Sequence, residues 1–159
     1  MIRLVPSLSR DERGASLIEM AMAMPVLASL LIGMVDISRA YSAKLQLEQS
    51  AYRAVEKVQQ YQATASTYDT LKAEAGAAAR AAGFTSVSDN DVVIDYWLEC
   101  NGARQSDYNT VCSGGQSYAR WITVDIPGTF TPMFSSRHWP GANTNGTFTL
   151  HGKAGLRTQ

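Results

Sequence analysis

Catalysis in proteins commonly depends on histidine, cysteine or paired carboxylates, and this chain has few such residues spaced to act together. Its two histidines, His138 and His151, lie in the segments SSRHWPG and TLHGK, and we interpret both as surface or strand residues. The sequence has no nucleophile elbow, no glycine-rich phosphate loop and no H-E-x-x-H motif. The scattered acidic residues do not follow calcium-loop spacing, although weak calcium binding near Asp89 to Asp91 stays open. We therefore predict a protein that is not an enzyme and has no cofactor or metal site.

The two cysteines, Cys100 and Cys112, enclose 11 residues. Two thiolates with no histidine nearby make a poor zinc site. If this part of the chain lies outside the cytoplasm, oxidation is allowed, and closing a loop of this length would contribute about 3 kcal/mol. We expect a Cys100–Cys112 disulfide; the alternative is two free thiols.

A long apolar run begins at Ala15 and ends at Val35. Its 21 residues contain one charge, Glu19, and residues 20–35 contain none. A helix needs about 20 mostly apolar residues to cross a bilayer, so the run is just long enough. We predict a membrane-spanning helix, because soluble core helices rarely have apolar groups on every face. The alternatives are a buried core helix and a cleaved secretory signal, with Ser38 to Ala40 as its cleavage site.

The charges before the apolar run predict its orientation. Three arginines outnumber two acidic residues there, namely Arg3, Arg10 and Arg13 against Asp11 and Glu12. Short cytoplasmic segments carry an excess of Lys and Arg. We expect the N-terminus in the cytoplasm and everything after Asp36 on the far side of the membrane.

The residue types within this region have physical consequences of their own. Gly14 has no Cβ and would let a peptidase approach the backbone closely. Glu19 needs a partner or a role, because an unpaired carboxylate in hydrocarbon costs several kcal/mol or must be protonated. Pro25 removes a backbone donor and predicts a kink or a loosened turn. The small residues that would let a second helix approach are Ala21, Ala23, Ala28, Ser29 and Gly33.

Each of these features also has a simpler interpretation. Gly14 could merely mark the start of the helix, and Glu19 could be solvated at the level of the lipid headgroups. The small residues could belong to a monomeric anchor.

Two stretches resemble a known family. The segment RDERGASLIEM, residues 10–20, resembles the processing site of type IV prepilins, which prepilin peptidases cut after the glycine. The segment EMAMAMPVLASLLIGMVD that follows is similar to the TadE-like pilins of the tight adherence (Tad, or Flp) pilus system. Pro25, Gly33 and Asp36 fill the positions of that pattern, and the resemblance covers about residues 10–60.

The resemblance implies cleavage between Gly14 and Ala15, which would make Glu19 the fifth residue of the mature chain. The new α-amine of Ala15 would then pair with Glu19 of its own subunit or, as we favour, of a neighbour. The implied partners are a prepilin peptidase, the major pilin and other minor pilins, inner-membrane platform proteins and membrane lipid. The implied location is the bacterial inner membrane, with the C-terminal domain in the periplasm or, within a pilus, outside the cell.

The chain departs from the major Flp pilins, which are much shorter and tend to have tyrosine where it has Met20. We therefore expect a minor pilin or pseudopilin that takes part in assembly, initiation or the tip of the pilus. The alternatives are a signal-anchored extracytoplasmic binding module without an assembly role and a secreted enzyme.

The elements that hold these residues are a helix from about Ala15 to Gln62 and a short alanine-rich helix that starts near Ser66 to Asp69 and stops at Gly83. Alternating apolar residues then predict strands at 92–100, at 118–126 before Pro127-Gly128, and at 147–156, separated by surface loops. We assign most tryptophans and tyrosines to the core; the alternative is an adhesive role. The expected fold is α+β, with an antiparallel sheet covering the apolar stripe of the long helix. The expected parts are a leader (1–14), a transmembrane helix (15–35), its extracytoplasmic continuation (36–62) and a globular domain (63–159).

Composition agrees with one modest domain. The chain has 159 residues, of which 18% are charged, and its 14 basic and 14 acidic residues cancel. Because nucleic-acid binding depends on a basic surface that releases counterions from phosphates, we expect no nucleic-acid partner.

Overall fold

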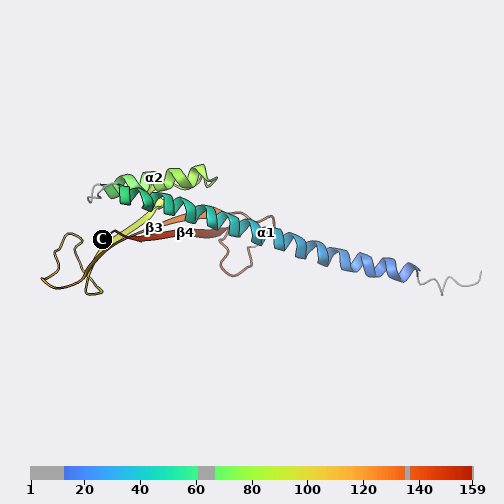
Figure 1. Cartoon of the computed structure of the whole chain (residues 1–159). Helices are drawn as coiled ribbons and strands as arrows, with labels where there is room; N and C mark the ends of the chain where they lie inside the picture. Colours follow the sequence, from blue (N-terminus) through green and yellow to red (C-terminus); the bar gives the residue numbers. More distant parts are fainter. Residues whose placement is uncertain (1–12, 61–66, 135–136, 159) are drawn as a thin grey trace, which may run out of the picture. The chain divides into compact units, whose positions relative to one another are not determined.

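The structure is a computed structural model that describes residues 13–60, 67–134 and 137–158. Its elements, coloured along the chain in Figure 1, are the helices α1 (Arg13–Gln60), α2 (Thr67–Ala81) and η2 (Asp89–Asp91) and the strands β1 (Val93–Cys100), β2 (Ala103–Arg104), β3 (Tyr118–Phe130) and β4 (Phe148–Arg157). The chain forms two compact units that divide between Ser38 and Arg39, so α1 contributes to both.

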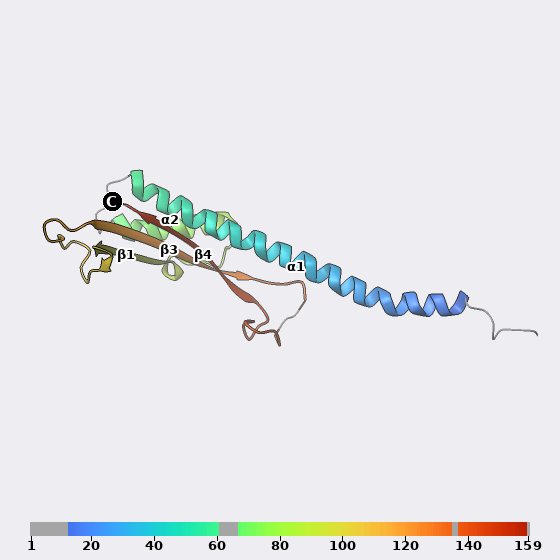
Figure 2. The same cartoon turned by 60° about the horizontal axis from the view of Figure 1, so that its bottom comes forward.

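The second unit is built on an antiparallel sheet with the strand order β2-β1-β3-β4. The β1–β3 register pairs Trp97 with Trp121, and the β3–β4 register pairs Ile126 with Gly152. Figure 2 shows the β3–β4 connection at one end of this sheet and the connection between residues 101 and 117 at the other. The helices come first along the chain and the antiparallel strands follow them. This arrangement confirms the expected α+β fold.

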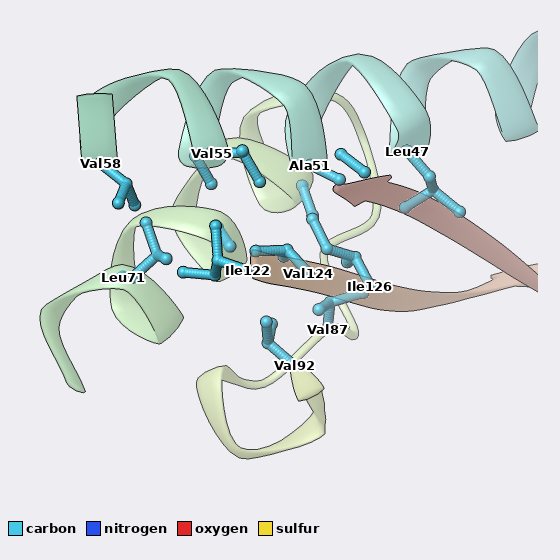
Figure 3. Packing of buried hydrophobic residues seen from close by; sticks show 14 of the residues in the cluster. Leu47, Ala51, Val55, Val58, Leu71, Val87, Val92, Ile122, Val124 and Ile126 are labelled. Carbon is cyan, nitrogen blue, oxygen red and sulfur yellow. The ribbon is translucent and has the colours of Figure 1, made fainter. Parts of the chain in front are cut away.

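The C-terminal part of α1 lies on one face of the sheet. Leu47, Ala51, Val55 and Val58 follow one another at steps of four, four and three residues, which places them on a single helix face, and all are buried. Figure 3 shows these side chains directed toward three buried strand residues, Ile122, Val124 and Ile126. Burial of each large aliphatic side chain contributes about 1.5–3 kcal/mol, so this stripe is a main source of the unit's stability.

Two glycines let the helix approach the sheet closely. A Cβ added at Gly152 would collide with the carbonyl carbon, the carbonyl oxygen and the Cβ of Leu47. A Cβ added at Gly128 would lie 2.7 Å from Leu47 Cδ1 and 2.8 Å from Phe84 Cδ1. The backbones of α1 and β4 therefore touch at a point where no side chain fits between them.

The alanine-rich helix α2 closes another side of the core with Leu71, Ala75 and Ala79, all buried. It ends at Ala81, and the expected stop residue Gly83 follows with φ +104° in a Schellman motif. The N–H of Phe84 donates to the carbonyl of Ala79, and the N–H of Gly83 donates to that of Arg80. The start that we expected near Ser66 falls partly outside the described residues.

One expected strand boundary is wrong. Pro127-Gly128 does not end the second strand, since β3 continues to Phe130 and Pro127 pairs with His151 in β4. The register between β1 and β3 stops at Val93 and Asp125, so beyond that pair β3 has a neighbour on one side only. A proline without an N–H is tolerated on such an open edge. The expected loop after residue 100 likewise contains the short strand β2.

The assignment of most tryptophans and tyrosines to the core is also wrong for the described part of the chain. Trp139 is 69% exposed, Tyr41 is 64% exposed, and Trp97 and Trp121 are only partly buried. The core consists mainly of Ala, Val, Leu and Ile. The aromatic side chains that are buried among the described residues are Phe84 and Phe130, whose rings have no polar group to satisfy.

Candidate functional site

The first unit exposes a continuous apolar surface on α1. Leu17 is 73% exposed, Met22 74% and Leu30 66%, and most of the large apolar side chains up to Val35 are exposed in the same way. Contiguous apolar patches of this kind are rare on soluble monomers. Among the described residues, α1 is the one helix long and apolar enough to cross a membrane, and its most apolar part is entirely unburied. The segment therefore indicates membrane anchoring or a signal function.

The expected processing site lies at the start of α1. Gly14 and Ala15 are the second and third residues of the helix, and a Cβ added at Gly14 would meet nothing within 4 Å. The amide groups of the first helical turn have no intrahelical acceptors, so this turn opens more easily than the rest. The remainder of the expected leader, residues 1–12, lies outside the described residues.

Glu19 is exposed on the surface of the helix, just after its first turn. Its neighbours three and four positions away are Ala15, Ser16, Met22 and Ala23, none of which carries a positive side chain. Within the described part of the chain, no ion pair forms at Glu19. The described side chains around Glu19 thus supply no cation for its carboxylate.

Pro25 lies inside α1, and the helix is assigned without a break on both sides of it. The ring removes the donor that would have reached the carbonyl of Ala21, so one turn has a weaker backbone ladder. One turn further on, Ser29 Oγ donates to the carbonyl of Val26 over 2.8 Å. The small residues Ala21, Ala23, Ala28 and Ser29 are exposed, and Gly33 is half-buried. Because these side chains are small, they would let the backbone of a second helix approach closely.

The expected disulfide joins Cys100 and Cys112, whose Cα atoms are 5.6 Å apart. Cys100 ends β1, so the bridge fixes the irregular segment that follows to the end of the sheet. Tyr108 of this segment packs edge-on against Tyr96, with ring centroids 5.3 Å apart. The bridge and the ring contact hold the connection between β2 and β3 against the sheet.

His151 and several acidic residues take part in ion pairs, whereas His138 lies exposed. His151 Nδ1 lies 2.9 Å from Asp125 Oδ1, and Asp125 Oδ2 lies 3.2 Å from Lys153 Nζ. Asp89, at the position where weak calcium binding stayed open, pairs with Arg80 over 2.8 Å. No cluster of three or more His, Cys, Asp or Glu side chains placed to hold a metal occurs among the residues that the structure describes.

An aromatic cluster that was not predicted from the sequence lies on the sheet face that the helices do not cover. Trp97 and Trp121 face each other across β1 and β3, with centroids 6.2 Å apart and planes inclined by 15°. Glu99 accepts a hydrogen bond from each indole N–H, at 2.8 Å and 3.1 Å. The guanidinium of Arg104 lies 4.7 Å from the ring centroid of Trp97. The alternation of apolar residues along β1 could have indicated that Trp97 and Glu99 face outward. That Trp121 lies opposite Trp97 follows only from the register between β1 and β3.

Comparison with known protein families gives a match to the N-terminal part of the chain. Residues 14–56 match the family described as TadE-like protein, over a segment that begins at Gly14 and includes the whole apolar run. No curated protein and no solved structure matches the chain. The family implies a pilin-like role associated with the Tad pilus, and proteins of this kind are in general structural and not enzymes.

Proposed function

Because residues 14–56 form a TadE-like domain, we propose that this protein is a minor pilin or pseudopilin of a Tad (Flp) pilus. Its precursor is anchored in the bacterial inner membrane, with the N-terminus in the cytoplasm and the C-terminal domain in the periplasm. A prepilin peptidase cuts it between Gly14 and Ala15. The mature subunit then takes part in assembly, initiation or the tip of the pilus, together with the major pilin, other minor pilins and inner-membrane platform proteins.

The observation that carries this proposal is the position of Glu19 on an apolar helix surface. A lone carboxylate at the edge of the hydrocarbon costs several kcal/mol unless it is paired or protonated. None of the helix neighbours of Glu19 can supply a positive charge. Cleavage after Gly14 creates an α-amine at Ala15, four residues away, which is the spacing of neighbours on one helix face.

The same pair can form between two subunits. The α-amine of one chain can pair with Glu19 of another chain. The two charges meet only at one relative position of the two helices along their axes. Small residues on the helix surface, such as Ala23 and Ala28, let the two backbones approach closely. The ion pair then determines the register of the helices, while van der Waals packing holds them together.

The accessible backbone at Gly14 supports processing at this bond. The residue is exposed, has no side chain and lies in the first turn of α1, where the helix is easiest to open. The family match also starts at this residue.

Mass spectrometry of the N-terminus of the protein purified from its native membrane tests the proposal. An N-terminus at Ala15 supports it. An intact Met1 would instead favour a signal-anchored binding module, and an N-terminus near Tyr41 or Lys44 would favour a secreted product. Either of these two results overturns processing at Gly14.

The role of the charge is tested with Glu19→Ala and Glu19→Gln. Both variants should insert and be processed, but neither should enter the sheared pilus fraction, because both lack the carboxylate. Ser16→Ala is the matched control, since Ser16 lies on the same helix face three residues before Glu19, and it should be incorporated normally. Normal incorporation of Glu19→Gln would refute the pairing.

A further inference from the structure

A hollow of about 430 Å³ opens on the sheet between β1, β3 and β4. Its solvent-accessible lining residues occupy alternate positions along these strands, so they share the face that the helices leave uncovered. All lining residues belong to the second unit, and the hollow therefore does not depend on how the two units are arranged. The accessible lining residues are Val93, Thr123, Asp125, Lys153 and Gly155, and the buried Val124 and Ala154 lie between them in the chain.

The strand register explains why the surface is low at this point. Thr123 pairs with Asp95 of β1 and with Gly155 of β4, so these three residues form one row across the sheet. Gly155 has no side chain and Thr123 has a short one, which leaves this row lower than its neighbours. The neighbouring row on one side is Val93, Asp125 and Lys153, and the row on the other side is Trp97, Trp121 and Arg157. We call the second of these the tryptophan row.

The tryptophan row lies about 7 Å from the hollow along the strands, and its rings have their polar groups satisfied. Both indole N–H groups donate to Glu99, so the accessible part of Trp97 and Trp121 is hydrocarbon. Arg104 lies over the ring of Trp97 and is itself held by two hydrogen bonds to Asp95, at 2.8 Å and 3.1 Å. The rings are therefore fixed before a ligand arrives, which lowers the entropy that binding costs.

The charged side chains around the hollow are paired with one another. Asp125 lies 2.9 Å from His151 Nδ1 and 3.2 Å from Lys153 Nζ. Among the described strand residues of this face, three acidic side chains balance three basic ones, so an ionic ligand meets no net charge of the opposite sign. Hydroxyl groups both donate and accept, and they can bond to the carboxylate and to the ammonium group without disturbing that balance. The acidic residues are Asp95, Glu99 and Asp125, and the basic ones are Arg104, Lys153 and Arg157.

We propose that the hollow and the tryptophan row bind two adjacent sugar units of a neutral oligosaccharide. One unit occupies the hollow, where its hydroxyl groups bond to Asp125 and Lys153. The next unit lies against Trp97 and Trp121, because the C–H groups of a pyranose ring are apolar and pack on aromatic carbon. An extended peptide suits this place less well, since its backbone gains its hydrogen bonds at a sheet edge and the hollow lies on a sheet face. The inference depends neither on processing at Gly14 nor on the membrane anchor.

Isothermal titration calorimetry of the full-length protein tests this binding. The protein is kept in a polyoxyethylene detergent, which carries no sugar headgroup. The probes are three neutral tetrasaccharides (maltotetraose, cellotetraose and mannotetraose), two charged ones (tetragalacturonate and chitosan tetramer) and an acidic peptide. At least one neutral tetrasaccharide should bind saturably, and its affinity should not change between about 0.05 M and 0.5 M NaCl, because the ligand has no charge to screen.

Variants of the hollow locate the site. Gly155→Leu places a side chain in the hollow and should weaken binding by more than about tenfold. Gly155→Ala is the matched control, since it adds a single methyl group and should bind within about threefold of wild type. Lys153→Met removes the ammonium group from a residue whose side chain is 70% exposed, so it should stay folded and still weaken binding. Near-ultraviolet circular dichroism checks that each variant is folded.

Three results would overturn the inference. The first is no saturable binding of any neutral tetrasaccharide up to about 10 mM. The second is tighter binding of a charged tetrasaccharide or of the acidic peptide. The third is equal affinity of wild type and Gly155→Leu for the neutral probe. The N-terminus of the same preparation, read by mass spectrometry, reports on the proposed function separately, so either conclusion can fail without the other.

Discussion

Replacement of Gly152 by alanine tests how the helix is seated on the sheet. The added Cβ would collide with the backbone carbonyl and the Cβ of Leu47. Leu47 is fully buried, and rotation of its side chain cannot move these atoms. The helix must therefore shift away from β4 as a body, by roughly 1 Å, before the contact becomes acceptable.

The size of the effect follows from what that shift disturbs. Leu47, Ala51 and Val55 lie on the shifted face, and all three are buried. Overpacking of a well-packed core costs typically 1–3 kcal/mol. The lower entropy of the unfolded chain after Gly→Ala returns about 0.4–1 kcal/mol. We expect a net loss of about 2 kcal/mol in the free energy of unfolding, which lowers the Tm of a domain of this size by about 8 °C.

Two other glycines make a matched series. Gly128→Ala would bring its Cβ to 2.7 Å from Leu47 Cδ1 and 2.8 Å from Phe84 Cδ1, which belong to side chains that can adjust. Its expected cost is about 1 kcal/mol. Gly155→Ala, on the same strand as Gly152, would bring its Cβ to 3.1 Å from the methyl group of Thr123 and to an ordinary contact distance of 3.6 Å from the carbonyl oxygen of Ile122. We therefore expect a change within about 0.5 kcal/mol.

The measurement is urea unfolding of the full-length variants in a mild non-ionic detergent, followed by far-ultraviolet circular dichroism. The expected order of destabilisation is Gly152→Ala, then Gly128→Ala, then Gly155→Ala. A free energy of unfolding for Gly152→Ala that equals that of Gly155→Ala would refute the backbone contact between α1 and β4.

Two further predictions concern the sheet. The free energy of unfolding of the double variant Cys100→Ser and Cys112→Ser should be about 3 kcal/mol lower, because the unfolded chain regains the entropy of the open loop. Reduced wild type should melt at the same temperature as the double variant. A wild-type Tm that does not change with reductant would contradict this. Glu99→Gln replaces the charged acceptor that the indole N–H groups of Trp97 and Trp121 share. The free energy of unfolding should fall by about 1 kcal/mol, and the near-ultraviolet circular dichroism of the tryptophan pair should change. An unaltered spectrum would show that Glu99 does not orient the rings.

Much of the fold could be predicted from residue patterns. The long helix could be expected because residues 37–61 contain no Gly or Pro and repeat apolar residues at helical spacing. The end of α2 could be expected because Gly83 adopts a positive φ that other residues rarely adopt. These signals are local, so they do not depend on what packs against the element.

Other features could not be obtained in this way. Pro127 indicates a strand end, yet it lies within β3, because β1 stops short and leaves the strand open on one side there. The Trp97 and Trp121 pair exists because the register of two strands places them opposite each other. Both facts depend on where a distant segment begins and ends.

The features of the candidate site also divide into those that the sequence determines and those that the tertiary structure determines. The sequence by itself determined the apolar run, the isolated carboxylate of Glu19 and the glycine before it, because membrane cost and peptidase access depend on the types of adjacent residues. Only the tertiary structure decided that Glu99 accepts hydrogen bonds from both Trp97 and Trp121, on two neighbouring strands. The physical reason is range: a residue's cost in lipid is a local quantity, whereas its neighbours across the fold are determined by packing between segments far apart in the chain.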